Sequence, residues 1–163
     1  MPHGYRPGNV DIQRYYDAEH EVLIAYGDFT PLHESYLDHA RRWGSVPEPL
    51  FCTMILQGLS AAALHMSCRP KDEIVSWTIS IQKPKMNLFL TGNSKQNSVV
   101  GRIFNEGVKD ADIDRMFVQT QRSQQQMRES VVQIQSLDLL EIFETYFTES
   151  EQNHARFFDY DNG

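Results

Sequence analysis

A long apolar segment at residues 50–67 dictates how the rest of the chain has to be arranged. It is bounded by Pro47-Glu48-Pro49 before it and by Arg69-Pro70 after it. Proline is tolerated in the first turn of a helix and disfavours helix in the residue before it, so these bounds predict one helix of about five turns. Apolar side chains occur on nearly every side of that helix, which therefore has to be buried all round. Because polar residues such as Gln57 and His65 interrupt the segment, we predict a central core helix rather than a membrane span.

Short segments with the composition of β-strands lie on both sides of this helix in the sequence. A brief apolar run predicts a first strand at residues 21–26. Alternating or β-branched segments predict further strands, at 73–81, 86–90, 98–104, 115–121 and 130–135. Residues 155–158 alternate in the same way and predict a last strand. Several strands follow one another without helical crossovers, so the sheet is predicted to be antiparallel.

Two amphipathic helices complete the pattern. Thr30-Pro31 is typical of an N-cap followed by a first-turn proline, and Gly44 is well placed as the C-terminal stop. Ser136 is predicted to cap a third helix, whose apolar residues recur three and four positions apart up to Phe147. The order of elements predicts an α+β fold in one domain over residues 1–163, with residues 1–20 as a candidate for a loosely ordered arm.

Composition narrows the classes of function. The formal net charge is −7 and the sequence pI is about 5.3, so the chain would repel a phosphate backbone and we expect no nucleic-acid partner. Residues 1–20 lack the apolar core of a signal peptide. Only two cysteines occur, Cys52 and Cys68, which suits a reducing compartment. We therefore expect a cytoplasmic protein without a membrane partner.

The sequence contains no convincing catalytic pattern. His65 and Cys68 stand three apart and could offer two metal ligands, but a closed zinc site needs four. Cys52 and Cys68 lie in the apolar helix, where inert packing is the default for a thiol. Ser150 and His154 could be enlisted as a hydrolase pair, yet polar residues at a helix end are better explained by satisfying its last carbonyl groups. We expect no enzyme, no metal and no cofactor in this chain.

The end of the third helix carries the most specific motif. Tyr146-Phe147-x-x-Ser150-Glu151-Gln152 resembles the signature of the heat-shock protein 33 family, the redox-regulated holdase chaperones of bacteria. Weaker similarities occur in the expected order, at 12–15, 46–50, 56–64, 72–90 and 131–152. The resemblance implies an antiparallel sheet packed against helices, like the N-terminal domain of that family. It also implies that the five signature residues have a structural role, since none has an assigned catalytic function.

Three departures from the family pattern affect what the resemblance implies. Gln82-Lys83-Pro84-Lys85 replaces a Gly-Asp-Gly-Pro turn, and the family's four-cysteine zinc module does not occur in this sequence. The redox switch is thus expected to be absent here, either because this is a shortened relative or because the chain stops before a regulatory half. The sequence ends soon after Phe158, where the family would add another strand. An unpaired edge would remain, and dimerisation by strand exchange would cover it.

The resemblance implies an ATP-independent holdase that binds unfolded client proteins through an apolar sheet face. The alternative is an interaction or regulatory module that kept the fold and recognises one partner. A continuous apolar sheet face would favour the holdase, and a small pocket with a polar rim would favour the module. Strand alternation supplies the candidate client-binding residues, which are Ile74, Trp77, Ile79, Ile81, Leu88, Leu90, Met116 and Val118.

Overall fold

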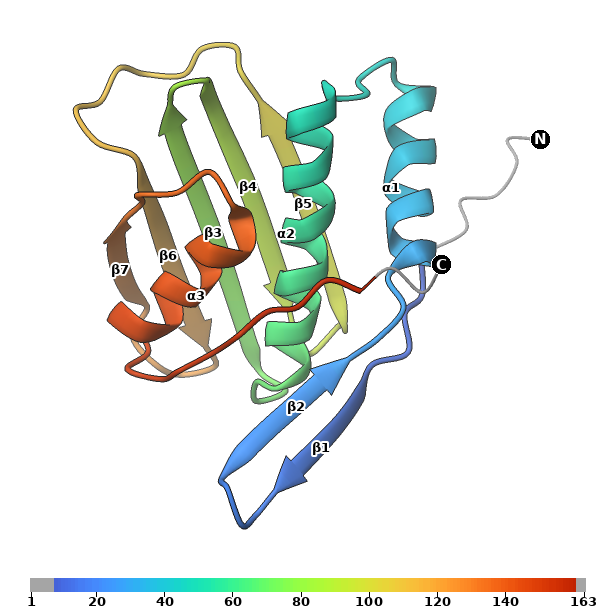
Figure 1. Ribbon diagram of the computed structural model, residues 1–163, viewed down its shortest axis with the longest axis vertical. Helices are drawn as coiled ribbons and strands as arrows, with labels where there is room; N and C mark the ends of the chain where they lie inside the picture. Colours follow the sequence, from blue (N-terminus) through green and yellow to red (C-terminus); the bar gives the residue numbers. More distant parts are fainter. Residues whose placement is uncertain (1–7, 161–163) are drawn as a thin grey trace.

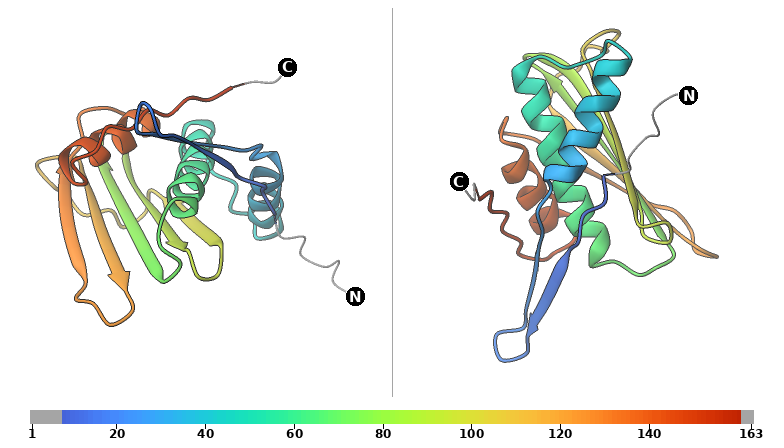
Figure 2. Two further views of the ribbon diagram at one scale, coloured as in Figure 1. Left: turned by 90° about the horizontal axis from the view of Figure 1, so that it is seen from below. Right: turned by 90° about the vertical axis from the view of Figure 1, so that its right-hand side faces the viewer.

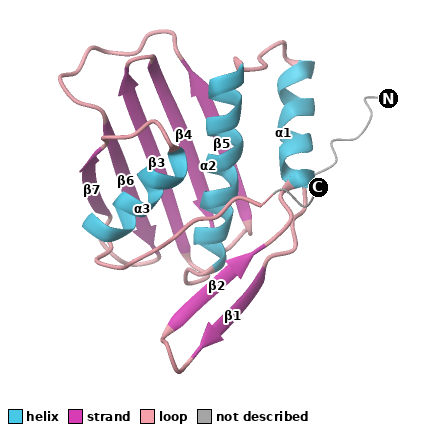
Figure 3. Cartoon of the chain, in the orientation of Figure 1, coloured by secondary structure: helices cyan, strands magenta, loops and turns pink. Residues whose placement is uncertain are grey.

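A five-stranded antiparallel sheet, with helices packed on one of its faces, makes up most of the fold (Figure 1). The computed structural model describes residues 8–160. Along the chain the order is two strands, two helices, five strands and one helix (Figure 3). The predicted α+β class is confirmed.

The strands of the large sheet lie in the spatial order β5-β4-β3-β6-β7, all antiparallel. The central strand β3 pairs with both neighbours at Trp77, which lies opposite Leu90 on one side and Val118 on the other. All five strands predicted for this region are present, although β7 begins two residues before the predicted start at 130. Their bounds are β3 Glu73–Gln82, β4 Lys85–Asn93, β5 Ser98–Phe104, β6 Arg115–Arg122 and β7 Arg128–Gln133.

Helix α2 (Pro49–Ser67) lies over β4 and β5 and is the core helix that the sequence predicts (Figure 2). Ile55 and Ala62 on it have no exposed surface. Glycine lets the sheet approach closely, because a Cβ on Gly92 would lie 2.2 Å from Cγ of Met66. By length and composition alone α2 could cross a membrane, but 50% of its apolar window is buried in this fold.

The N-caps of the other two helices lie one or two residues away from the predicted ones. Helix α3 (Leu139–Glu149) also covers the sheet, and its N-cap is Asp138, whose Oδ1 accepts hydrogen bonds from the N–H groups of Leu140 and Glu141. The predicted cap Ser136 instead donates to Glu141 Oε2 at 2.6 Å.

Helix α1 (Thr30–Arg42) packs beside α2. The predicted cap Thr30 is its first residue, and Asp28 Oδ1 accepts the N–H of Thr30 at 2.9 Å. The predicted stop after α1 is confirmed, since Gly44 adopts a left-handed φ of 61°.

A separate hairpin projects from the body of the molecule (Figures 1 and 2). It consists of β1 (Gln13–Asp17) and β2 (Val22–Tyr26), paired antiparallel with Tyr15 opposite Ile24. The strand predicted at 21–26 is therefore present, whereas β1 lies in a segment for which the sequence indicated no period. Residues 1–7 of the proposed arm fall outside the described residues.

The strand predicted at residues 155–158 is wrong. Within the described chain this segment has no regular secondary structure, and it runs from the end of α3 towards α2 (Figure 1). The backbone N–H of Phe157 donates to Glu144 Oε1 at 2.8 Å rather than to another strand. Alternation of apolar residues here reflects Phe157 facing the core and Phe158 facing away from it.

Candidate functional site

The face of the large sheet beneath α2 and α3 holds seven of the eight residues predicted to bind clients. Strand side chains alternate between faces, and on this face they are covered by the helices and lose essentially all contact with solvent. They are therefore core residues in this structure, and the expectation that they form an accessible surface is corrected. Those seven are Trp77, Ile79, Ile81, Leu88, Leu90, Met116 and Val118. Ile74 differs, since it points to the opposite face and is 40% exposed.

The opposite face, which we call the open face, is not covered by any of the three described helices (Figure 2). Phe89 is 39% exposed there, Val131 59% and Val100 64%. Phe89, Thr78, Phe117 and Val131 follow one another across β4, β3, β6 and β7, because consecutive members are register partners. Phe89, Phe117 and Val131 thus form an apolar band that only Thr78 interrupts. The neighbouring positions on the open face are mostly polar or charged, with Val100 and Phe104 as exceptions.

Aromatic rings hold one end of this band in place. The Phe89 ring stacks on Phe104 with centroids 5.4 Å apart, and the Arg102 guanidinium lies 5.2 Å from the Phe104 centroid. Arginine over an aromatic ring gains electrostatic attraction and still keeps its charge near water. This end of the open face can therefore contact both apolar and acidic groups.

A hollow of about 560 Å³ lies next to these rings, under the loop between β5 and β6. Phe104, Phe117 and Val131 contribute its apolar lining, and Ser80, Asn87 and Arg115 contribute polar groups. Two aspartates bind the loop to the turn between β3 and β4. Asp114 Oδ1 accepts the Gln82 N–H at 2.7 Å, and Asp110 forms an ion pair with Lys85. The arrangement is a shallow apolar depression with a polar rim.

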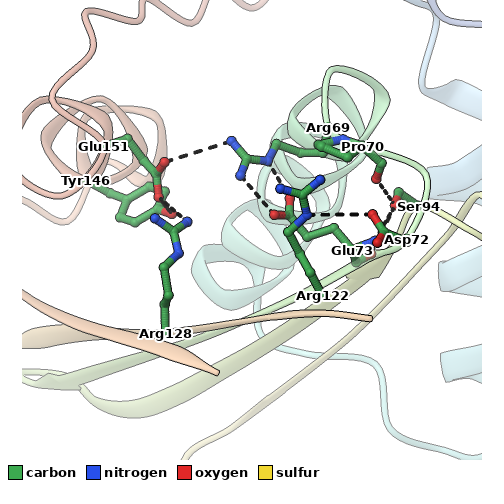
Figure 4. A network of polar contacts seen from close by, with 9 residues as sticks. All are labelled: Arg69, Pro70, Asp72, Glu73, Ser94, Arg122, Arg128, Tyr146 and Glu151. Carbon is green, nitrogen blue, oxygen red and sulfur yellow. Dashed lines mark hydrogen bonds and ion pairs between the residues drawn. The ribbon is translucent and has the colours of Figure 1, made fainter. Parts of the chain in front are cut away.

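The signature motif meets the end of the sheet in a network of polar contacts (Figure 4). Tyr146 donates its hydroxyl proton to Glu151 Oε1 at 2.7 Å. The same carboxylate lies 3.8 Å from Arg69 Nη1 and 3.8 Å from Arg128 Nη2. Glu151 therefore links α3 to the end of α2 and to β7.

Arg69 also forms the strongest pair in this network. Its Nη2 donates to Glu73 Oε1 at 2.9 Å while its Nε contacts Glu73 Oε2, so the pair is bidentate. Glu73 is completely buried, and Ser94 Oγ accepts its backbone N–H at 3.0 Å. The hydrogen bond to Glu73 raises the pKa of the Arg69 guanidinium. A buried carboxylate needs such a partner because desolvation penalises its charge.

The remaining signature residues fix how the chain leaves α3. Ser150 Oγ hydrogen-bonds Ser130 Oγ on β7 at 2.8 Å, and Phe147 accepts the Asn153 N–H at its carbonyl oxygen. Gln152 adopts a left-handed φ of 51°, which turns the chain back over the helix. These contacts assign a structural part to each signature residue, and Ser150 is bonded to Ser130 rather than to His154.

Histidine and cysteine form no reactive cluster in the described residues. His65 is buried, with its ring 5.3 Å from Trp77, and burial followed by the charge of Arg69 lowers its pKa to about 4. Cys52 and Cys68 are free thiols. Between residues 8 and 160 no group of three or more His, Cys, Asp or Glu side chains is placed to hold a metal ion.

The open face was missed by sequence reasoning, although a usable signal was present. Alternation in β4 places Phe89 on the side opposite Leu88 and Leu90. It could not say which side the helices would cover, because both sides carry apolar residues. Strand β1 of the hairpin shows no comparable alternation of apolar residues.

The fold and the site define an α+β domain whose helices cover one face of an antiparallel sheet and leave the other face open. Neither a sequence family nor a curated protein matches the chain. Among solved structures the chain is similar to the 33 kDa chaperonin, a heat-shock protein 33 homologue, of Thermotoga maritima. The TM-score is 0.68 at 19% sequence identity, over 86% of this chain.

The likeness to that chaperonin confirms the predicted resemblance at the level of the fold. The chain spans about half of the chaperonin's length, since the match covers 51% of it. This extent is consistent with the N-terminal domain that the signature motif indicated.

Proposed function

We propose that this chain is an ATP-independent holdase-type chaperone domain that binds unfolded protein segments through the open face. The observation that carries the proposal is the apolar band of Phe89, Phe117 and Val131, on a sheet face that no described helix covers. Val100 is exposed beside this band. Association through buried apolar area is not directional, so such a face can accept many different sequences. The fold of a protein named as a chaperonin supports the same conclusion.

The proposal includes no chemical step and no cofactor. Binding and release of apolar segments need neither, and the two cysteines give too few thiolates for a four-ligand zinc switch. We therefore propose a cytoplasmic domain whose activity is the same under reducing and oxidising conditions. We also propose that it works as a homodimer joined through the exposed β1–β2 hairpin.

The experiment is the aggregation of a heat-unfolded client protein, followed by light scattering with and without the chain, in dithiothreitol and in peroxide. Suppression of scattering under both conditions is expected. Suppression under neither condition would exclude the holdase and move the assignment to the alternative below. Suppression only after oxidation would contradict the absence of a switch.

A double variant locates the activity on the open face. Phe89→Ser with Val131→Ser removes two exposed apolar groups, and we expect suppression to fall at least about fivefold, because the remaining band offers little area to bury. The matched control is Trp43→Ser with Val46→Ser, which removes two exposed apolar groups after α1. Equal loss in both variants would show that surface apolarity in general is responsible.

The alternative is an interaction module that recognises one partner. The hollow of about 560 Å³ favours it, because its apolar lining and polar rim suit one side chain more than a variety of segments. Phe117→Ala removes part of that lining. In this case it would abolish binding of the partner and leave the result of the aggregation assay unchanged.

A further inference from the structure

The segment after α3 lies on the helix like a bound peptide. We call residues 153–160 the strap. It has no regular secondary structure, and it runs from the end of α3 across the lower part of α2 (Figure 1). The proposed holdase function does not use it.

One carboxylate binds the strap at two adjacent points. Glu144 on α3 is mostly buried, with 18% of its side chain exposed. Its Oε2 accepts a hydrogen bond from Arg156 Nη1 at 3.0 Å, and its Oε1 accepts the backbone N–H of Phe157 at 2.8 Å. Glu144 thus recognises an extended backbone together with an arginine just before it, and both hydrogen bonds are strengthened by the negative charge.

An aromatic pocket completes the contact. The Phe157 ring lies 6.0 Å from the centroids of both Phe143 and Phe147, and it packs against the core. Phe158, the next residue, is 72% exposed. The helix therefore contacts the aromatic ring of Phe157 and makes no use of the exposed ring of Phe158.

Part of the strap borders a cavity. A cavity of about 570 Å³ is lined by His154, Ala155 and Arg156, by residues of α3 and by residues 132–136. Interiors of folded proteins are normally filled to crystal-like density, so this part of the strap contributes little packing. The strap is held mainly at Glu144 and at the Phe143–Phe147 pocket.

We propose that the strap is a releasable ligand bound in cis, and that the α3 groove of Glu144, Phe143 and Phe147 accepts an extended peptide with an arginine followed by an aromatic residue. The chemistry is that of the strap itself: a guanidinium and a main-chain N–H for the carboxylate, and a ring for the aromatic pocket. This groove is independent of the proposed holdase activity, because it lies on the helical side of the molecule and not on the open face.

The test is the binding of a fluorescent peptide with the sequence of residues 153–160 to the full chain, measured by anisotropy. A groove that is mostly occupied in cis binds a trans ligand only in proportion to the vacant fraction. Phe157→Ala in the chain should loosen the strap and tighten peptide binding at least about tenfold relative to the unchanged chain. The matched control Phe158→Ala alters an exposed neighbouring ring and should bind as weakly as the unchanged chain.

Two further variants test whether the strap and Glu144 determine peptide binding. Arg156→Gln removes one strap contact at a residue whose side chain is 79% exposed, so it leaves the core intact and should also tighten peptide binding. Glu144→Ala combined with Phe157→Ala should abolish binding, and a peptide with alanine in place of Phe157 should not bind. Equal binding to the unchanged chain and to both loosened variants would overturn the proposal, as would undiminished binding to the Glu144→Ala variant.

Discussion

At the residue scale, we expect the buried Glu73 to be especially sensitive to changes in its surroundings. A carboxylate without solvent is stable only with full hydrogen bonding, and here Arg69 supplies two donors from a planar fork. Arg69 itself reaches Glu151, so the charge at the end of the sheet is shared along the network of Figure 4. Removal of the arginine would leave the Glu73 carboxylate without its partner, whereas Glu151 would keep Tyr146 and Arg128.

We expect Arg69→Ala to lower the free energy of unfolding by about 3 kcal/mol, because breaking a buried pair leaves an uncompensated charge. The comparison is Arg41→Ala, which breaks an exposed pair with Asp38 and should cost less than about 1 kcal/mol. Urea denaturation of the two variants measures both values. Similar losses would mean that the Glu73 carboxylate finds another partner.

His65 predicts a dependence of stability on pH. Burial lowers its pKa from 6.5 to about 4 in the folded chain, so the unfolded chain binds more protons between these values. Stability is therefore full above pH 6.5 and falls as the pH drops towards 4, by roughly 3 kcal/mol. His65→Leu should remove this part of the slope in urea midpoints measured from pH 7 to pH 4. The same substitution at the exposed His39 should leave the slope as it is.

At the scale of elements, alternation and end signals predicted most of the fold. The five strands of the large sheet and the core helix were found because each has a clear period or clear proline bounds. Strand β1 was missed because Gln-Arg-Tyr-Tyr-Asp does not alternate, and its pairing depends only on β2. The strap was mistaken for a strand because a single sequence shows alternation but not what the backbone N–H of Phe157 binds.

The start of α3 shows the same limit and gives a prediction. Ser136 and Asp138 both suit an N-cap, and only the structure identifies Asp138 as the acceptor for the first helical N–H groups. We expect Asp138→Ala to cost about 1 kcal/mol of stability, whereas Asp138→Asn should cost only a few tenths, since asparagine caps almost as well. Thermal denaturation distinguishes them. A large loss with asparagine would show that the charge at Asp138 matters more than its hydrogen bonds.

At the scale of the whole molecule, the two faces of the sheet differ in their exposure to solvent. Burying the seven candidate residues under α2 and α3 provides the core, and it leaves the open face with one apolar band flanked by mostly polar positions. The site could be predicted only in part, because the choice of covered face depends on where the helices pack. The projecting hairpin adds a second apolar surface at a distance from both.

The hairpin offers the clearest test of assembly. All five residues of β1 and four of β2 are exposed, and a two-stranded ribbon is marginally stable in water unless other strands or a helix support it. Pairing with the hairpin of a second copy would bury the Tyr15–Tyr26 stack and the neighbouring Ile24. We expect the unchanged chain to sediment as a dimer at micromolar concentration, and Ile24→Lys to sediment as a monomer, because an edge lysine opposes strand pairing. Trp43→Lys, at an even more exposed site after α1, should remain dimeric, and a dimer that persists in Ile24→Lys would place the contact elsewhere.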